Sequence, residues 1–382
     1  MLWDIFCRVI DNHGDLGVCW RMSADLAKRG HHVRLWVDDA TALTWMAPEA
    51  KVYAQGLALD ATPTGQVIVR PWALPLQPQD VASDVWIEAF GCDLPEHFLA
   101  WANLAQSGAE NAPNTPSDPS AQVASWPVWL NLEYLSAESY VERSHRLPSP
   151  VMSGPLKGRT KWFFYPGFTH QTGGLIREPQ IEESIRSSGS TGFEPATSQT
   201  FPKRSTLFCY EPAALAEALQ LASLNKDGHQ WQVAHGRGAL AFEAAYKQAL
   251  RNWPQHLAKP SFHLLPPVSQ TQFDQVLASS DLNFVRGEDS LVRAMWAGKA
   301  FVWQIYPQDD GAHGAKLNAF LDWLQAPESL RRFHLRWNGL SQEPLPQLDL
   351  ASWQACALAA RERLMQQMDL VSQLLQFVAE KR

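Results

Sequence analysis

The sequence predicts two doubly wound α/β domains, each with a parallel sheet covered by helices on both faces. Short apolar runs alternate with amphipathic segments in both halves of the chain, which is typical of βαβ units. The length of 382 residues fits two domains, at roughly 150 residues per domain. In each half an acidic, glycine-containing cluster also follows an apolar run, and the carboxyl end of a strand is where ligands bind in such sheets.

The first half begins with a predicted buried strand over residues 3–9, followed by a polar turn over 11–17. An amphipathic helix is predicted over 18–28, and Gly30 is well placed to end it. A second strand over 33–37 completes a βαβ unit. Further strands of this domain are predicted over 67–69, 85–90 and 128–134, and the aromatic stretch 162–168 ends at a turn.

Two segments lack the apolar periodicity of regular elements. Residues 107–122 are rich in Ser, Ala, Asn and Pro and are predicted to form an exposed loop. Residues 173–204 hold Gly, Ser, Thr, Pro and charged residues, and we interpret them as an interdomain linker or an insertion. The first domain is therefore predicted over residues 1–172.

The second domain is predicted over 205–359, with strands over 206–210, 230–234, 262–265, 282–285 and 300–305. Helices are predicted after Pro212 and over 269–277, 291–296 and 317–324, with Gly298 closing the third. Apolar residues at a 4-3-4-3 spacing from Leu364 to Val378 predict one long terminal helix. We expect residues 360–382 to cross back to the first domain.

Composition excludes several classes of protein. The net charge of −7 and the pI of about 5.9 leave no broad basic field, so nucleic acid is not an expected ligand. No run approaches the roughly 20 apolar residues of a membrane span, and the N-terminus does not resemble a signal peptide. The five cysteines are scattered without C-x-x-C spacing, which indicates reduced thiols in a cytoplasmic protein rather than a zinc site.

The turn over residues 11–17 places two carboxylates, Asp11 and Asp15, at the end of the first strand. Gly14 and Gly17 would permit a tight turn and close approach of a ligand. Neighbouring carboxylates can hold different pKa values, which leaves one of them able to accept a proton. The alternative is an ordinary turn in which Asp15 caps the following helix. The third ligand that a metal site would need is not evident.

The second cluster, Arg286 to Ser290, lies where a strand is followed by a helix. Backbone N–H groups at a helix N-terminus favour phosphate, and Arg286 could pair with a diphosphate while one of the two neighbouring acids accepts a ribose hydroxyl. The alternative is that Asp289 and Ser290 form an ordinary N-cap.

Four segments, in order along the chain, resemble the bacterial elongation factor P arginine rhamnosyltransferases of the EarP family. They are DIFCRVIDNHGDLGVCWR at 4–21, FFYPGF at 163–168, LFCYE at 207–211 and NFVRGEDS at 283–290. The resemblance implies a GT-B fold, with two Rossmann-like domains facing each other across a cleft. It also implies a cytoplasmic inverting enzyme that moves L-rhamnose from dTDP-β-L-rhamnose to one arginine of elongation factor P, with no cofactor and no metal.

The resemblance also assigns roles to individual residues. Asp15 matches the general base, Asp11 its essential neighbour and Glu288 the other acid at the reacting centre. The positions that match the binding site for dTDP-rhamnose are Phe208, Tyr210, Gln270, Arg286, Asp289 and Ser290.

Three alternatives remain open from the sequence. The chain could be a GT-B glycosyltransferase with another acceptor, or a dTDP-sugar-binding protein without catalysis. Retention of both Asp11 and Asp15 argues against simple binding, because the second cluster alone would suffice for it. A metal-dependent transferase is the third alternative.

Overall fold

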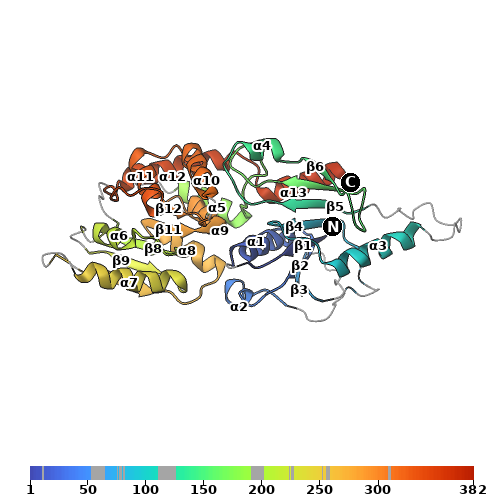
Figure 1. The fold of residues 1–382 in the computed structure, drawn as a ribbon, viewed down its shortest axis with the longest axis horizontal. Coiled ribbons are helices and arrows are strands. Elements are labelled where there is room, and N and C mark those ends of the chain that lie inside the picture. Colours follow the sequence, from blue (N-terminus) through green and yellow to red (C-terminus); the bar gives the residue numbers. More distant parts are fainter. Residues whose placement is uncertain are drawn as a thin grey trace. The chain divides into compact units, whose positions relative to one another are not determined.

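The computed structural model describes residues 1–382 apart from 11–12, 53–64, 75, 77–79, 81, 111–125, 191–201, 223, 225–227, 252, 255–258 and 309–310. The chain forms two compact units. The first comprises Met1–Leu135, Tyr140–Arg177 and Met368–Arg382, and the second comprises Ser136–Ser139 and Glu178–Gln367. Both are α/β units built on a sheet of parallel strands, which confirms the predicted fold class (Figure 1).

The first unit contains a seven-stranded sheet in the order β3-β2-β1-β4-β5-β7-β6. Neighbouring strands are parallel except β6, which runs antiparallel to β7. The strands are β1 (Leu2–Cys7), β2 (His32–Val37), β3 (Val67–Pro71), β4 (Val85–Ala89), β5 (Val128–Leu132), β6 (Pro148–Pro150) and β7 (Thr160–Phe164). The helices are α1 (Gly14–Lys28), α2 (Leu43–Met46), α3 (Glu96–Glu110), α4 (Tyr140–Ser144) and α13 (Leu370–Lys381).

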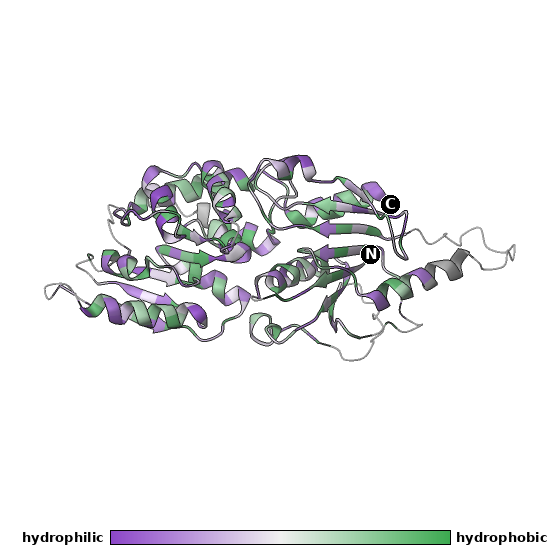
Figure 2. Ribbon diagram, in the orientation of Figure 1, coloured by the Kyte–Doolittle hydropathy of each residue, from purple (hydrophilic) through white to green (hydrophobic). Residues whose placement is uncertain are grey.

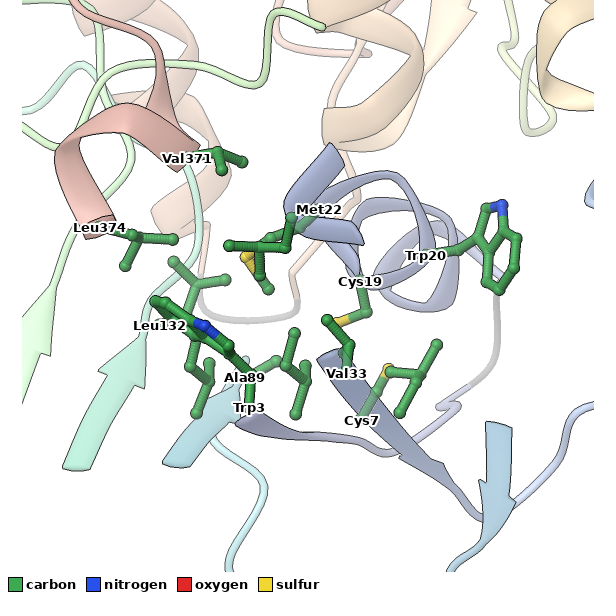
Figure 3. Close-up of a cluster of buried hydrophobic side chains, with 14 of the residues drawn as sticks. Trp3, Cys7, Cys19, Trp20, Met22, Val33, Ala89, Leu132, Val371 and Leu374 are labelled. Carbon is green, nitrogen blue, oxygen red and sulfur yellow. The ribbon is translucent and has the colours of Figure 1, made fainter. Parts of the chain in front are cut away.

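Alternating side chains of β1 pack on the two faces of this sheet, as the two-residue period of a strand requires. Trp3, Ile5 and Cys7 join the cluster formed with α1 and α13. Figure 3 shows Cys19 and Met22 of α1 in that cluster, with Val371 and Leu374 of α13 beside them. Phe6 joins the second cluster on the opposite face, where its ring lies 4.7 Å from that of Phe98 in α3.

The second unit contains a five-stranded parallel sheet in the order β10-β9-β8-β11-β12. Its strands are β8 (Arg204–Leu207), β9 (Gln230–Val233), β10 (Ser261–Leu264), β11 (Leu282–Arg286) and β12 (Ala300–Gln304). Its helices are α5 (Pro179–Ser190), α6 (Leu215–Ala222), α7 (Arg237–Arg251), α8 (Gln270–Ser279), α9 (Gly287–Ala297), α10 (Ala312–Leu324), α11 (Glu328–Trp337) and α12 (Leu350–Met365). Hydrophilic and hydrophobic residues alternate along the helices, as α7 illustrates in Figure 2.

The two sheets share an order that locates their ligand-binding positions. Both contain five strands arranged 3-2-1-4-5, so the direction in which successive strands are added to the sheet reverses between β1 and β4 in one unit and between β8 and β11 in the other. Open α/β sheets bind ligands beyond the carboxyl ends of the strands at this switch point. The two sequence clusters, which follow β1 and β11, each lie at such a point.

The C-terminal segment differs from the single long helix predicted over 360–382. Helix α12 ends at Met365 and α13 starts at Leu370. Asp369 caps α13, because its carboxylate accepts a hydrogen bond from the backbone N–H of Ser372 at 2.9 Å. Only Met368–Arg382 belongs to the first unit, so α13 alone returns to it.

Two predicted loops contain helices. Residues 107–110 of the predicted exposed loop lie in α3, and the remainder, from 111, lies outside the described residues. Helix α5 occupies part of the predicted 173–204 linker, and residues 191–201 are likewise outside the described residues. The second unit begins again at Glu178, within that segment.

Candidate active site

Helix α1 begins earlier than predicted and includes the acidic residue Asp15. His13 is the N-cap residue and makes no side-chain capping bond, so Asp15 is the second residue of the helix rather than its cap. Gly14 and Gly17 are also helical, and the prediction that they form a tight turn was wrong. The first helical turn carries the positive end of the helix dipole, which favours a carboxylate at this position. Asp11 lies outside the described residues.

Tyr134, just beyond the end of β5, contacts Asp15. Its hydroxyl donates a hydrogen bond to Oδ2 of Asp15 at 3.3 Å. The Tyr134 ring is 41% exposed and stacks on Phe90, with ring centroids 5.0 Å apart and an interplanar angle of 29°. The start of α1 and the ends of β4 and β5 therefore contribute Asp15, Phe90 and Tyr134 to one polar and aromatic group.

Phe90 adopts a backbone conformation that a non-glycine residue rarely takes. Its φ is 59°, and Gly91 follows with φ of 73°. The left-handed region costs a non-glycine residue about 1–2 kcal/mol, and such residues gather at functional sites. This conformation lies at the switch point of the sheet, at the residue whose ring stacks on Tyr134.

Burial shifts the pKa values of two further acids of the first unit, of which Glu88 is buried and Glu133 half-buried. Burial raises the pKa of Glu88 in β4, while the hydrogen bond and charge of Lys161 oppose that rise. Burial also raises the pKa of Glu133, whose carboxylate accepts a hydrogen bond from Nδ2 of Asn131 at 2.7 Å. The sequence did not single out either acid, because each reads as part of a strand.

In the second unit, three of the predicted donor-site residues meet between the ends of β8 and β11. The guanidinium carbon of Arg286 lies 4.6 Å from the ring centroids of both Phe208 and Tyr210. Nη1 of Arg286 also donates to the backbone oxygen of Cys209 at 3.4 Å. Burial lowers the pKa of Arg286 and raises the pKa of Tyr210 to about 12. A cation held between two aromatic rings can present its edge to an anion.

The N-terminus of α9 is built differently from an ordinary cap. Arg286 is the N-cap residue without a side-chain capping bond, so the alternative in which Asp289 and Ser290 form the cap is wrong. The Ser290 hydroxyl accepts a hydrogen bond from the Arg286 N–H at 3.1 Å and donates to the Arg286 carbonyl. Gly287 has φ of 67°, and Nε1 of Trp303 donates to its carbonyl at 2.8 Å.

The acids of this cluster face different partners. Oε1 of Glu288 accepts a hydrogen bond from Nζ of Lys316 in α10 at 2.6 Å. The charge of Asp289 is among those that raise the pKa of the buried Arg293, although burial of that guanidinium acts in the opposite direction. Lys316 carries no sequence signal of its own, because it adjoins the apolar stripe of a helix.

Gln270 is the first residue of α8, one residue after the predicted helix start at Ser269. Ser269 caps this helix, with its hydroxyl accepting from the Gln272 N–H at 3.3 Å and Gln272 bonding back to Ser269 N–H at 2.9 Å. Phe273, one turn after Gln270, lies edge-on to Phe208 with centroids 5.4 Å apart. The helix that carries Gln270 thus packs against the aromatic wall beside Arg286.

Neither a metal centre nor a membrane-crossing helix emerges from the residues that the structure describes. Among them, no three His, Cys, Asp or Glu side chains are grouped as a metal site requires. No helix in the same part of the chain is long and apolar enough to span a bilayer.

A family model and individual relatives place the chain in the same family. Residues 3–379 match the family model described as elongation factor P (EF-P) rhamnosyltransferase EarP. The chain is 37% identical to a protein-arginine rhamnosyltransferase of Pseudomonas aeruginosa, covering 99% of each protein. A protein of the same name from Shewanella oneidensis is 33% identical over 98% of this chain and 97% of its own length.

A solved structure agrees with these relatives. It concerns EarP-mediated arginine glycosylation of translation elongation factor EF-P, and it is 25% identical to this chain. The match has a TM-score of 0.55 and covers 100% of this chain and 99% of that one.

Proposed function

Because the chain belongs to the EarP family and is a protein-arginine rhamnosyltransferase, we propose that its donor is dTDP-β-L-rhamnose and its acceptor an arginine of translation elongation factor P. The observation that carries the proposal is the family match over residues 3–379, which spans both acidic clusters. The solved relative, whose subject is glycosylation of EF-P, supports this acceptor. We place the reaction in the cytoplasm, where a translation factor acts.

We assign donor binding to the second unit. The N-terminus of α9 offers backbone N–H groups and the positive end of a helix dipole to a diphosphate. Arg286, held between Phe208 and Tyr210, adds a fixed positive charge at the same place. Asp289 would accept a ribose hydroxyl. Ser290 would contribute by fixing the backbone at the start of α9, since its hydroxyl already bonds to Arg286.

We assign acceptor activation to the first unit, with Asp15 as base and Asp11 as its neighbour. A guanidinium is protonated in proteins and is a poor nucleophile. As its nitrogen forms a bond to the anomeric carbon of rhamnose, the bond from that carbon to the diphosphate oxygen breaks. The nitrogen loses a proton, which Asp15 accepts, and attack opposite the leaving diphosphate inverts the anomeric centre. Carboxylates also match the planar fork of the guanidinium and can orient it.

The role proposed for Glu288 is to contact the sugar near the reacting carbon. Its position in the first turn of α9 keeps a carboxylate close to the predicted diphosphate site. In our proposal the reaction requires neither a cofactor nor a metal, because Arg286 and the helix N-terminus supply the positive charge that a metal would otherwise supply.

The test is a transfer assay with purified components. We expect EF-P to gain the mass of one deoxyhexose on a single arginine when the enzyme and dTDP-rhamnose are both present. Substitution of that arginine by lysine in EF-P should abolish the gain, and added chelator should leave the rate unchanged. Modification of another acceptor in a lysate, but not of EF-P, would refute the acceptor. Binding of dTDP-rhamnose without turnover on any acceptor would indicate a sugar-nucleotide sensor.

A further inference from the structure

Glu288 forms a short charge-assisted hydrogen bond with Lys316 of α10. The Nζ–Oε1 distance is 2.6 Å, which is at the short end for an ammonium and a carboxylate. The two side chains are only 20% and 21% exposed. The pair is therefore better shielded from solvent than the surface salt bridges that contribute little to stability.

The backbone positions on both sides of this pair are fixed by packing. Lys316 precedes Leu317, the first of four buried residues through which α10 packs into the core of the unit. Phe320 of the same helix lies edge-on to Trp303 of β12, with centroids 5.1 Å apart. The indole N–H of Trp303 in turn bonds to the carbonyl of Gly287, next to Glu288. The start of α9 and the second half of α10 are thus connected through the side chain of Trp303.

A glutamate side chain without such a partner has three rotatable bonds and several accessible rotamers. A carboxylate that must contact a sugar near its reacting carbon needs one orientation, because small displacements of catalytic groups are costly. The ammonium of Lys316 supplies a directional contact to one carboxylate oxygen of Glu288. Lys316 can also donate two more hydrogen bonds to neighbouring acceptors.

From this geometry we propose that Lys316 is a positioning residue of the transfer reaction, which orients the carboxylate of Glu288 toward the sugar. The proposal rests on the function proposed above, and adds a residue from the helix after β12 to the groups supplied by β8 and β11. It predicts that Lys316 acts through Glu288. A lysine that bound the donor diphosphate directly would act independently of it.

A double-mutant cycle separates these two roles. We expect Lys316→Met to lower kcat by about 10- to 100-fold at saturating donor and acceptor, as expected for a displaced catalytic group. In a Glu288→Gln background the same change should cost less than about twofold, because the group that Lys316 orients is already impaired. Lys316→Arg should recover part of the lost rate. The Kd for dTDP, measured by calorimetry, should change by less than about twofold.

The matched control is Lys247→Met, which removes an exposed lysine from α7 of the same unit and should leave kcat and Kd unchanged. Three results would overturn the proposal. They are an equal loss of rate in both backgrounds, a loss confined to dTDP affinity, and a wild-type kcat for Lys316→Met.

The proposal can also be tested apart from the transfer reaction. In a crystal structure of Lys316→Met, the Glu288 carboxylate should occupy a different rotamer, whereas in Lys247→Met it should keep its place. If the wild-type protein failed to modify EF-P but this displacement occurred, the proposed function would be wrong and the orienting contact would stand. If the wild-type enzyme modified EF-P but the Glu288 carboxylate kept its rotamer in Lys316→Met, only the positioning role would be refuted.

Discussion

Replacement of Asp15 by asparagine should separate catalysis from folding. The substitution keeps the size of the side chain and removes the negative charge that we assign to the base. The hydroxyl of Tyr134, which donates to Oδ2 of Asp15 at 3.3 Å, can still donate to an amide oxygen. The variant therefore keeps its contact with the end of β5 but loses its capacity to accept a proton.

The two expected effects differ greatly in size. General base catalysis contributes about 10²- to 10⁴-fold, or roughly 3–5 kcal/mol, so kcat should fall by that factor. Stability should change little, because Asp15 caps no helix and lies in the first turn of α1. Loss of its favourable interaction with the helix dipole should cost about 0.3–1 kcal/mol, equivalent to a fall in Tm of about 1–4 °C for a unit of this size.

The assay is the rate of deoxyhexose addition to EF-P by the variant, together with its thermal unfolding and its Kd for dTDP. Asp93→Asn is a matched control, because Asp93 is an exposed acid shortly after the end of β4. It should be as active as the wild type. A kcat for Asp15→Asn above about a third of the wild-type value would refute the base assignment. A fall in Tm well beyond that predicted would show that Asp15 has a structural role instead.

Three other predictions follow from the same geometry. Asp289→Ala should weaken dTDP binding by about 10- to 100-fold in calorimetry, because a charged acceptor for a ribose hydroxyl is lost; unchanged affinity would exclude Asp289 from the donor site. Tyr134→Phe keeps the ring stack on Phe90 but removes the hydroxyl beside Asp15, so kcat should fall by about 3- to 10-fold with unchanged Tm, and a wild-type kcat would contradict this contact. His334 is fully buried, and burial lowers its pKa from 6.5 to about 4. The unfolded chain therefore binds more protons at this site between these pH values, and the free energy of unfolding should fall by about 3 kcal/mol as the pH drops from 7 to below 4. Urea unfolding across this range should show a smaller fall for His334→Gln, and an identical fall would contradict the assignment.

The chain has the GT-B fold, with two Rossmann-like units, and much of this architecture was predictable from the sequence. Buried parallel strands are short apolar runs, and β1, β2, β11 and β12 stand out for that reason. The 3-2-1-4-5 order of the strands was not predicted, because doubly wound sheets occur in more than one strand order. The acidic clusters could be located because they directly follow such runs.

The residues at which helices begin and end were less predictable. Glycine suits both a tight turn and a helix that packs closely, so Gly14 and Gly17 did not reveal that α1 already begins at Gly14. Between α12 and α13 the opposite error occurred. The apolar spacing continues across the break, and what ends the register is a local cap at Asp369 together with the bond from Leu370 N–H to the carbonyl of Leu175 at 2.9 Å.

The partners of the candidate catalytic acids were decided by tertiary structure alone. Tyr134 lies 119 positions from Asp15, and Lys316 lies 28 positions from Glu288. The apolar periodicity of a strand or helix shows only which face of that element is buried. It does not show which residues of different elements contact each other. The sequence by itself determined the two sheets and the acids at their carboxyl ends. Only the packing of separate elements determined which side chains hold those acids in place, since a hydrogen bond depends on positions in space that strand order and helix contacts define.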